Sequence, residues 1–254
     1  MKIIIPELNN PTIQKAIQNF PKVEFLSAGN LVHATEILNQ GQADSILSGL
    51  DYSSRDVLIA MKDNLPLKSD FFSSSFICEK GDQIYALADG GVNKLPNKEQ
   101  LYTIVEDTTE TFIAYTGKQP KIAMLSYSTN GSGGKNPDLE KIHFVIDQIR
   151  QNHPDWLIGG EMQLDTAIIP EISAKKYPES VIKGQANILI TPDLNSGNIL
   201  YKAMERFGGF TVAGPMIQGF ATPLADLSRG STTKDVTLTL KVLIKQIERN
   251  SQNA

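Results

Sequence analysis

The sequence predicts an α/β protein with mainly parallel sheets and flanking helices. Short apolar runs, many of them β-branched, alternate along the chain with longer segments of helical periodicity. Loops rich in glycine, serine and asparagine follow several of these runs. The chain has 254 residues, of which 41% are hydrophobic. That is enough for one large domain or two modest domains, each with a buried core.

The predicted strands are nine short apolar runs. The first carries one positive charge and ends at Pro6, so we expect a strand there and not a secretory signal. In chain order the runs are Lys2–Ile5, Val23–Leu26, Ser45–Leu47, Ser75–Cys78, Ile84–Ala88, Lys121–Leu125, Trp156–Ile158, Asn187–Ile190 and Phe210–Val212.

Three long helices are indicated by apolar residues that recur every three or four positions. Residues 101–113 form one such stripe, and residues 139–149 form a clearer one that opens at an Asn-Pro pair. The last stripe covers residues 236–247. One of the hydroxyl residues at 231–233 is available as its N-cap.

Composition excludes several classes of partner. The net charge is −4 and the charged fraction is 20%, which argues against binding nucleic acid. No apolar run approaches the ~20 residues that a membrane helix needs. Cys78 is the only cysteine, and His33, His143 and His153 are scattered, so we expect neither a disulfide within the chain nor a metal site. A cytoplasmic protein without metal is the resulting prediction.

Small and polar residues gather in three loops, at residues 126–134, 191–198 and 225–235. The first two follow predicted strands, and the third precedes the last helix. In open α/β sheets, ligands bind at the carboxyl ends of the strands. We therefore expect the functional site to be built from these loops.

The first loop offers the hydroxyls of Ser128, Thr129 and Ser132, together with backbone N–H groups freed by glycine and a helix N-terminus downstream. Both features favour a phosphate or an acyl phosphate. The loop matches neither the phosphate-loop signature nor the dinucleotide pattern, so a flexible connection remains the alternative. Glu161, after a later strand, contacts either a turn or a polar ligand.

The third loop contains Ser228-Arg229-Gly230. An arginine beside a glycine, ahead of a helix, can hold a phosphoryl group or a developing oxyanion with two parallel donors. Asp235 falls in the first turns of the last helix. It either caps that helix or acts as a general base, and the residues alone leave both roles open.

Four stretches of the chain, taken together, resemble the signature blocks of the phosphotransacetylase family, the phosphate acetyl/butyryltransferases. They occur in the order and with the spacing of that family, and the resemblance covers residues 43–250. Weaker matches lie at Ser48-Gly49 and Ala88–Asn93. The four blocks are Ala123–Thr129, Gly160–Pro170, Pro192–Lys202 and Asp226–Gly230.

The resemblance implies a two-domain fold of the isocitrate/isopropylmalate dehydrogenase type. It places residues 1–67 and 228–254 in the first domain and residues 68–227 in the second, with the active-site cleft between them. A homodimer through the second domain is also implied. The family normally carries a further segment of tens of residues between its early strands, so this chain resembles a short form with a truncated first domain.

The implied activity is the transfer of a short acyl group, acetyl foremost, between phosphate and coenzyme A. Coenzyme A is a substrate, no cofactor is tightly bound, and the thiolate attacks the acyl phosphate directly. The resemblance implies that Asp235 is the base, that Ser228 orients the thiol and that Arg229 stabilises charge. It implies substrate-binding roles for Ser128, Thr129, Gly131, Ser132 and Asn195.

The chain departs from the family pattern at Ser53–Ile59. The acetyltransferase pattern there is S-S-x-D-x-x-R, and its substrate-binding arginine falls on Ile59. Arg55 lies one helical turn earlier, so we predict that it projects from nearly the same face and binds substrate instead.

Three alternatives remain open. One is a butyryl-type acyltransferase with the same chemistry. Another is a non-catalytic homologue that binds acyl phosphate or coenzyme A, which the missing arginine favours. A dehydrogenase on the related fold is the third, although no nucleotide or metal-carboxylate signature supports it.

Overall fold

The structure is a computed structural model that describes residues 1–253, and its contacts divide into two compact units. Unit 1 holds Met1–Phe72 and the chain from Thr211 onward, and unit 2 holds Ser73–Phe210. The boundaries predicted from the sequence are 67/68 and 227/228. The structure has them at 72/73 and 210/211. The second differs most because the strand at Thr211–Gln218 pairs with that at Leu224–Asp226, which in turn pairs with Ser45–Ser48 of unit 1.

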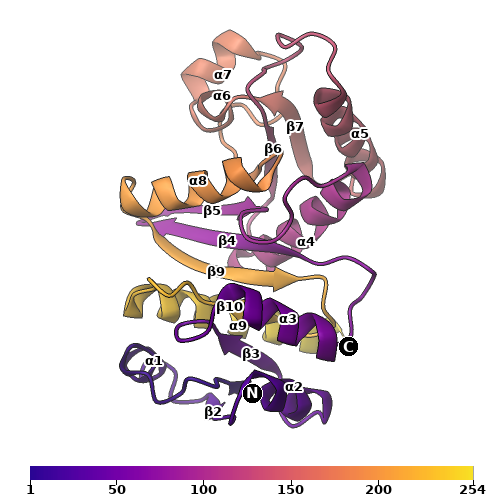
Figure 1. Cartoon of the computed structure of the whole chain (residues 1–254). Coiled ribbons are helices and arrows are strands. Elements are labelled where there is room, and N and C mark those ends of the chain that lie inside the picture. Colours follow the sequence, from indigo (N-terminus) through magenta and orange to yellow (C-terminus); the bar gives the residue numbers. More distant parts are fainter. Residues whose placement is uncertain (254) are drawn as a thin grey trace. The chain divides into compact units, whose positions relative to one another are not determined.

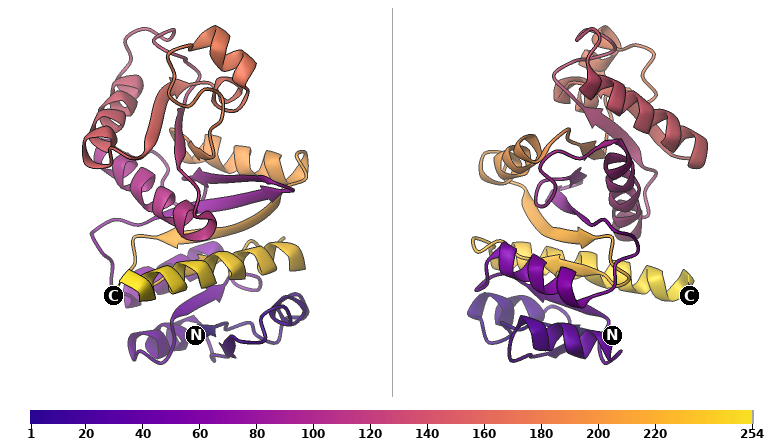
Figure 2. Two further views of the ribbon diagram at one scale, coloured as in Figure 1. Left: turned by 180° about the vertical axis from the view of Figure 1, so that it is seen from behind. Right: turned by 45° about the vertical axis from the view of Figure 1, so that its right-hand side comes forward.

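Unit 1 contains a mainly parallel sheet with strands in the order β2-β1-β3-β10-β9. All neighbours are parallel except β9, which runs antiparallel to β10. The strands are β1 (Lys2–Ile4), β2 (Glu24–Leu26), β3 (Ser45–Ser48), β9 (Thr211–Gln218) and β10 (Leu224–Asp226). Helices α1 (Pro11–Ile17) and α9 (Thr233–Asn253) cover one face, and α2 (Leu31–Asn39) and α3 (Ser54–Asn64) cover the other (Figures 1 and 2).

Unit 2 has the strand order β4-β5-β8-β6-β7, in which only β4 runs antiparallel to its neighbour. The strands are β4 (Ser73–Lys80), β5 (Gln83–Ala88), β6 (Lys121–Leu125), β7 (Leu157–Met162) and β8 (Ile188–Ile190). Helices α4 (Lys98–Thr116) and α5 (Pro137–Asn152) lie on one side of this sheet (Figure 1). On the other side lie α6 (Leu164–Ile168), α7 (Pro170–Lys176) and α8 (Leu194–Arg206) (Figure 2).

The predicted α/β class with mainly parallel sheets is confirmed. Each of the nine predicted strands is present, and the two long helices for which a cap was predicted, α5 and α9, begin at it. Asn136 accepts a hydrogen bond from the N–H of Asp138 at the start of α5, and Thr232 Oγ1 accepts one from Asp235 at the start of α9. The strand that the sequence analysis missed is β10.

Each unit has its own apolar core. In unit 1 it includes Ile46, Val57 and Leu224, and in unit 2 it includes Ala123, Met162 and Leu189. Cys78 is fully buried on β4, and burial raises the pKa of its thiol to about 12. A thiol in that state is an unreactive packing group. Across residues 1–253, no helix has the length and apolar content needed to span a bilayer.

Candidate active site

A buried glutamate holds the loop at residues 126–134 of unit 2. Glu161, near the end of β7, is 1% exposed. Its Oε1 accepts hydrogen bonds from Ser128 Oγ and from the N–H of Gly131, each at 2.7 Å, and its Oε2 lies 2.5 Å from His143 Nε2. Burial alone would raise the pKa of Glu161, but the hydrogen bonds from Ser128, Gly131 and His143 outweigh it and lower that pKa.

The backbone amides of this loop are already engaged. Every N–H from Ser128 to Gly134 donates to an acceptor inside the protein. The expectation that glycine frees them for an anion is wrong for this arrangement, because the turn folds back on Glu161 and on its own hydroxyls. Thr129 Oγ1 and Ser132 Oγ each accept a backbone N–H at 3.0 Å. Ser132 Oγ also lies 3.2 Å from Ser128 Oγ, whose own proton goes to Glu161, so Ser132 donates to Ser128 and Thr129 keeps its proton as a donor.

The weakly matching loop after β5 is built around another buried carboxylate. Asp89 accepts hydrogen bonds from the backbone N–H groups of residues 91–93 and from the Ser74 hydroxyl. The side-chain amide of Asn198, on α8, donates to the carbonyl of Gly90 at 3.0 Å. The loops after β5 and β8 therefore meet at the carboxyl edge of the sheet of unit 2.

Asn195 lies in the first turn of α8 and is exposed. Asp193 caps this helix by accepting a hydrogen bond from the N–H of Ser196 at 2.9 Å. Within the described chain, the side-chain amide of Asn195 makes no hydrogen bond to protein. It is therefore available to a ligand at the same edge.

In unit 1, the predicted arginine has a side chain without a partner among the described residues. Arg229 follows β10 and is exposed, and among residues 1–253 its guanidinium has neither an ion pair nor a hydrogen bond. Ser228 is half-buried, and its Oγ accepts the N–H of Gly230 at a long 3.4 Å. Arg55 and Ile59 are both exposed on α3, one turn apart, as the idea of a shared face requires.

Asp235 is part of the N-terminal cap of α9. It is 5% exposed, and its Oδ2 accepts hydrogen bonds from the N–H and the hydroxyl of Thr232 at 2.8 and 2.7 Å. Its Oδ1 accepts one from the N–H of Val212, at 3.0 Å. The capping role is thus visible, and the role as a base stays a prediction. A carboxylate can accept about four hydrogen bonds, so Oδ1 keeps a lone pair.

Comparison with known proteins decides the family. The family model described as phosphate acetyl/butaryl transferase matches residues 7–243. The chain belongs to this family. The resemblance seen in the four sequence blocks is therefore confirmed, as is the prediction of a transferase.

Individual relatives agree with the phosphate acetyl/butaryl transferase assignment. A phosphate acetyltransferase of Clostridium acetobutylicum is 36% identical over 236 residues, which are 90% of this chain and 71% of that protein. Other phosphate acetyltransferases are matched over 30% to 66% of their own length. A phosphotransacetylase structure from Streptococcus pyogenes superposes with a TM-score of 0.85 at 27% identity, over 98% of this chain and 94% of that one.

The wider fold class is also supported by structure. A 4-hydroxythreonine-4-phosphate dehydrogenase from Klebsiella pneumoniae superposes with a TM-score of 0.53 at 10% identity, over 96% of this chain and 88% of that one. At that identity the likeness concerns the fold alone. It agrees with the dehydrogenase-type fold that phosphate acetyl/butaryl transferases are expected to have.

Sequence reasoning missed a carboxylate cluster in this phosphate acetyl/butaryl transferase. Glu7 is buried, its Oε1 accepts the N–H of Gly49 at 2.8 Å, and its Oε2 accepts the hydroxyl of Ser48 at 2.8 Å. Gly49 has a φ of +116°, and a Cβ there would overlap the carboxylate of Asp226. The weak family match at Ser48-Gly49 was the one signal of this cluster.

Asp226 is the last residue of β10 and the first of the Asp226–Gly230 block. It is 0% exposed, and neither carboxylate oxygen accepts a hydrogen bond of ordinary geometry. Burial raises the pKa of Asp226 to about 7; the Ser54 hydroxyl opposes the rise and the negative charge of Glu7 adds to it. An unpaired carboxylate therefore lies two residues before Ser228.

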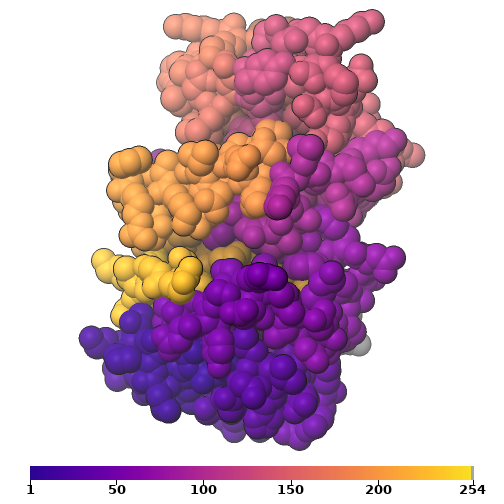
Figure 3. Space-filling view, viewed as in Figure 1, coloured from indigo at the N-terminus to yellow at the C-terminus, as the bar shows by residue number. Residues whose placement is uncertain are grey.

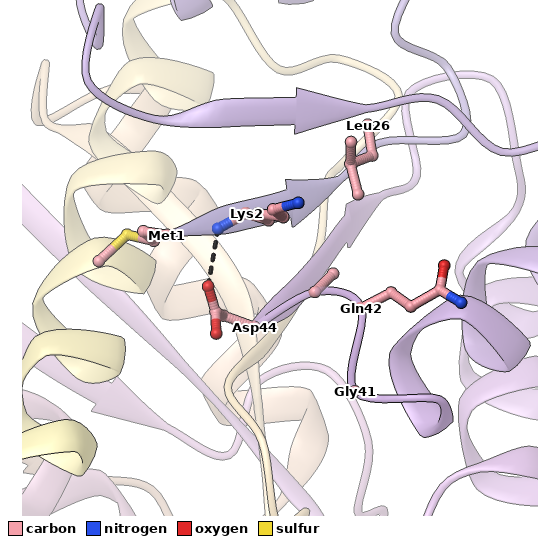
Figure 4. A pocket seen from close by; sticks show the side chains of 7 residues that line it. Met1, Lys2, Leu26, Gly41, Gln42 and Asp44 are labelled. Atoms are coloured by element: carbon pink, nitrogen blue, oxygen red, sulfur yellow. Dashed lines mark hydrogen bonds between the residues drawn. The ribbon is translucent and has the colours of Figure 1, made fainter.

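The hollow in Figure 4 lies at the other edge of the sheet of unit 1. There the backbone N–H of Lys2 donates to Asp44 at 2.7 Å, at the amino ends of β1 and β3. Gly49 and Asp226 lie instead at the carboxyl ends of β3 and β10, where ligands of such sheets bind. Over the described part of the chain, no three His, Cys, Asp or Glu side chains are grouped to share a metal ion.

Proposed function

We propose that this protein transfers a short acyl group, acetyl foremost, between phosphate and coenzyme A. The observation that carries the proposal is Arg229. It is an exposed guanidinium without a partner in the described residues, inside the Asp226–Gly230 block. Its planar fork suits a phosphoryl group or an oxyanion. The names of the relatives, phosphate acetyltransferase and phosphotransacetylase, support the same reaction.

In the proposed reaction, coenzyme A and acyl phosphate bind together and no acyl-enzyme forms. Asp235 accepts the thiol proton, and the thiolate forms a bond to the acyl carbon. The bond from that carbon to the phosphate oxygen then breaks, and phosphate leaves. Ser228 orients the thiol, and Arg229 stabilises the negative charge of the transition state. A thiol with a pKa of about 8.5 needs only modest help to ionise.

The loop at residues 126–134 is assigned to the acyl phosphate. The hydroxyl proton of Thr129 is an available donor, and the exposed Ser132 hydroxyl can turn from Ser128 to the ligand. Asn195 adds a side-chain amide on the same unit. Ser128 and Gly131 are already bonded to Glu161. We therefore propose that these two residues act by fixing the shape of the loop.

The remaining parts of the proposal concern setting and assembly. No tightly bound cofactor takes part, and the reaction is placed in the cytoplasm. A homodimer through unit 2 is favoured by apolar side chains on and beside α8, where Ile199 is 68% exposed and Phe207 is 94% exposed. Figure 3 shows this helix, in orange, on the surface of unit 2.

The purified protein, treated with a chelator, is expected to form acyl-CoA from coenzyme A and acetyl, propionyl or butyryl phosphate. Thioester formation measures the rate, and the ratio of the three rates separates an acetyl from a butyryl enzyme. Loss of activity on chelation, restored by a divalent metal, would contradict the metal-free mechanism. No turnover with any of the three would favour the non-catalytic homologue, for which Asp235 is only a cap.

Arg55→Ala is expected to raise the KM for one of the two substrates by about tenfold, since a charge-assisted hydrogen bond is worth roughly 1.5–3 kcal/mol. The measurement is KM for each substrate with the other saturating. Lys62→Ala, which removes another exposed cation of α3, is the matched control and should leave both values unchanged. Unchanged kinetics in Arg55→Ala would mean that Arg55 does not replace the family arginine.

A further inference from the structure

A chain of polar contacts links a solvent-exposed histidine to the loop assigned to acyl phosphate. The side chain of His143, on α5, is 51% exposed, whereas Glu161 beneath it is 1% exposed. Glu161 connects the histidine to the loop, because one of its oxygens contacts His143 and the other accepts hydrogen bonds from Ser128 and Gly131. These contacts lie in unit 2 and join α5, β7 and the loop.

The protonation states of Glu161 and His143 follow from the geometry of their contact. Glu161 is ionised, as its lowered pKa indicates, so it can only accept hydrogen bonds. Nε2 of His143, 2.5 Å from it, must therefore carry a proton and donate it to Glu161. A hollow of about 450 Å³ opens beside them. The other polar side chains that line it are Asn130, Asp147, Arg150 and Tyr177.

We propose that Glu161 is a positioning residue for acyl-phosphate binding and that His143 holds its carboxylate in place. The proposal rests on the function proposed above for the loop. Glu161 itself does not touch the substrate. By accepting from Ser128 and Gly131 it fixes the turn of the loop, and the hydroxyl of Thr129 is left as a donor for the ligand. Without His143, the carboxylate loses the partner that fixes its direction.

Two further charged groups lie near His143. Asp147 and Arg150 carry opposite charges beside His143 and lie on the same helix.

The chain offers a matched control for this pair. His153 Nε2 lies 2.6 Å from Glu106 Oε1, and both side chains are partly exposed, at 28% and 30%. His153 caps the C-terminus of α5, the helix that carries His143. It therefore tests the removal of a short His–Glu contact from the same helix without touching the loop.

His143→Ala is expected to raise the KM for acetyl phosphate about tenfold, with KM for coenzyme A and kcat within twofold. His143→Gln, which restores a donor to Glu161, should recover most of that loss. His153→Ala should behave like wild type. Amide hydrogen exchange of the 126–134 peptide, read by mass spectrometry, should quicken about tenfold in His143→Ala and not in His153→Ala.

The exchange measurement needs no enzymatic activity, so it separates this inference from the proposed function. Unchanged exchange in His143→Ala would overturn the positioning role, whatever the kinetics. If the wild type shows no turnover while exchange quickens as expected, the proposed function fails and the hold of His143 on the loop stands. An equal rise of KM in His143→Ala and His143→Gln would refute the need for a donor.

Discussion

Asp235→Asn is expected to lower kcat about 10²- to 10⁴-fold, the range attributed to a lost general base. The deficit should lie in deprotonation of the thiol. Raising the pH towards the thiol pKa of about 8.5 should then recover part of the lost rate, because coenzyme A ionises without help. The measurement is kcat with both substrates saturating, followed between neutral and mildly alkaline pH.

The same substitution also weakens the cap of α9. Asp235 accepts hydrogen bonds from Thr232 and from Val212. An asparagine presents one oxygen and one NH₂ group, so at least one of these donors loses its acceptor, at a cost of about 1–3 kcal/mol. Rates must therefore be expressed per folded molecule. Asn97→Ala, which removes the capping box of α4, is the control: it should cost similar stability and leave kcat unchanged.

Arg229→Ala supplies the contrast that assigns the two roles. It should lower kcat by a similar order through lost stabilisation of transition-state charge, and higher pH should not restore the rate. Arg229→Lys should recover little, because a single ammonium cannot reproduce two parallel donors. A kcat within a few-fold of wild type in Asp235→Asn, after correction for folding, would leave Asp235 as a cap and nothing more.

The parts of the fold that were predictable are those set by local sequence. Helices α4 and α5 follow from apolar periodicity, and the caps follow from Asn or Thr at the right place. Strand β10 did not follow, because Ala225 and Asp226 resemble the start of a polar loop in sequence and the strand depends on pairing with β3 and β9. The same non-local pairing moved the boundary of unit 1.

The candidate site divides in the same way. Arg229 and Asn195 were found from their blocks, and the structure leaves both side chains available. The hydrogen bonding of the 126–134 loop could not be predicted, because its amides donate to acceptors within the loop and to Glu161, on a strand about thirty residues later. From sequence alone, a serine- and glycine-rich loop gives no sign of whether its backbone N–H groups are free or bonded to a carboxylate far along the chain. The partnership of Glu161 with His143 has no sequence signature at all.

The other large expected effect concerns Asp226 and the stability of the folded protein. The pKa of Asp226 is raised from 3.8 to about 7 in the folded protein. Between these values the native state binds more protons than the unfolded state, so stability falls as pH rises through this window. Below pH about 4 the carboxyl is protonated in both states and the cost vanishes. Above pH about 7 the cost is complete, on the order of 4 kcal/mol at 1.36 kcal/mol per pKa unit.

Asp226→Asn should therefore stabilise the protein at pH 8, by roughly 2 kcal/mol once the desolvation of a buried amide is subtracted. The gain should shrink steadily towards pH 4. Urea unfolding at pH 4, 6 and 8 measures it, with Asp63→Asn, an exposed carboxylate of α3, as a control that should show no such trend. An Asp226→Asn protein that is no more stable than wild type at pH 8 would mean that the ionised carboxylate is satisfied in solution. The Ser54 hydroxyl, which already opposes the rise in pKa, is a group that could do so.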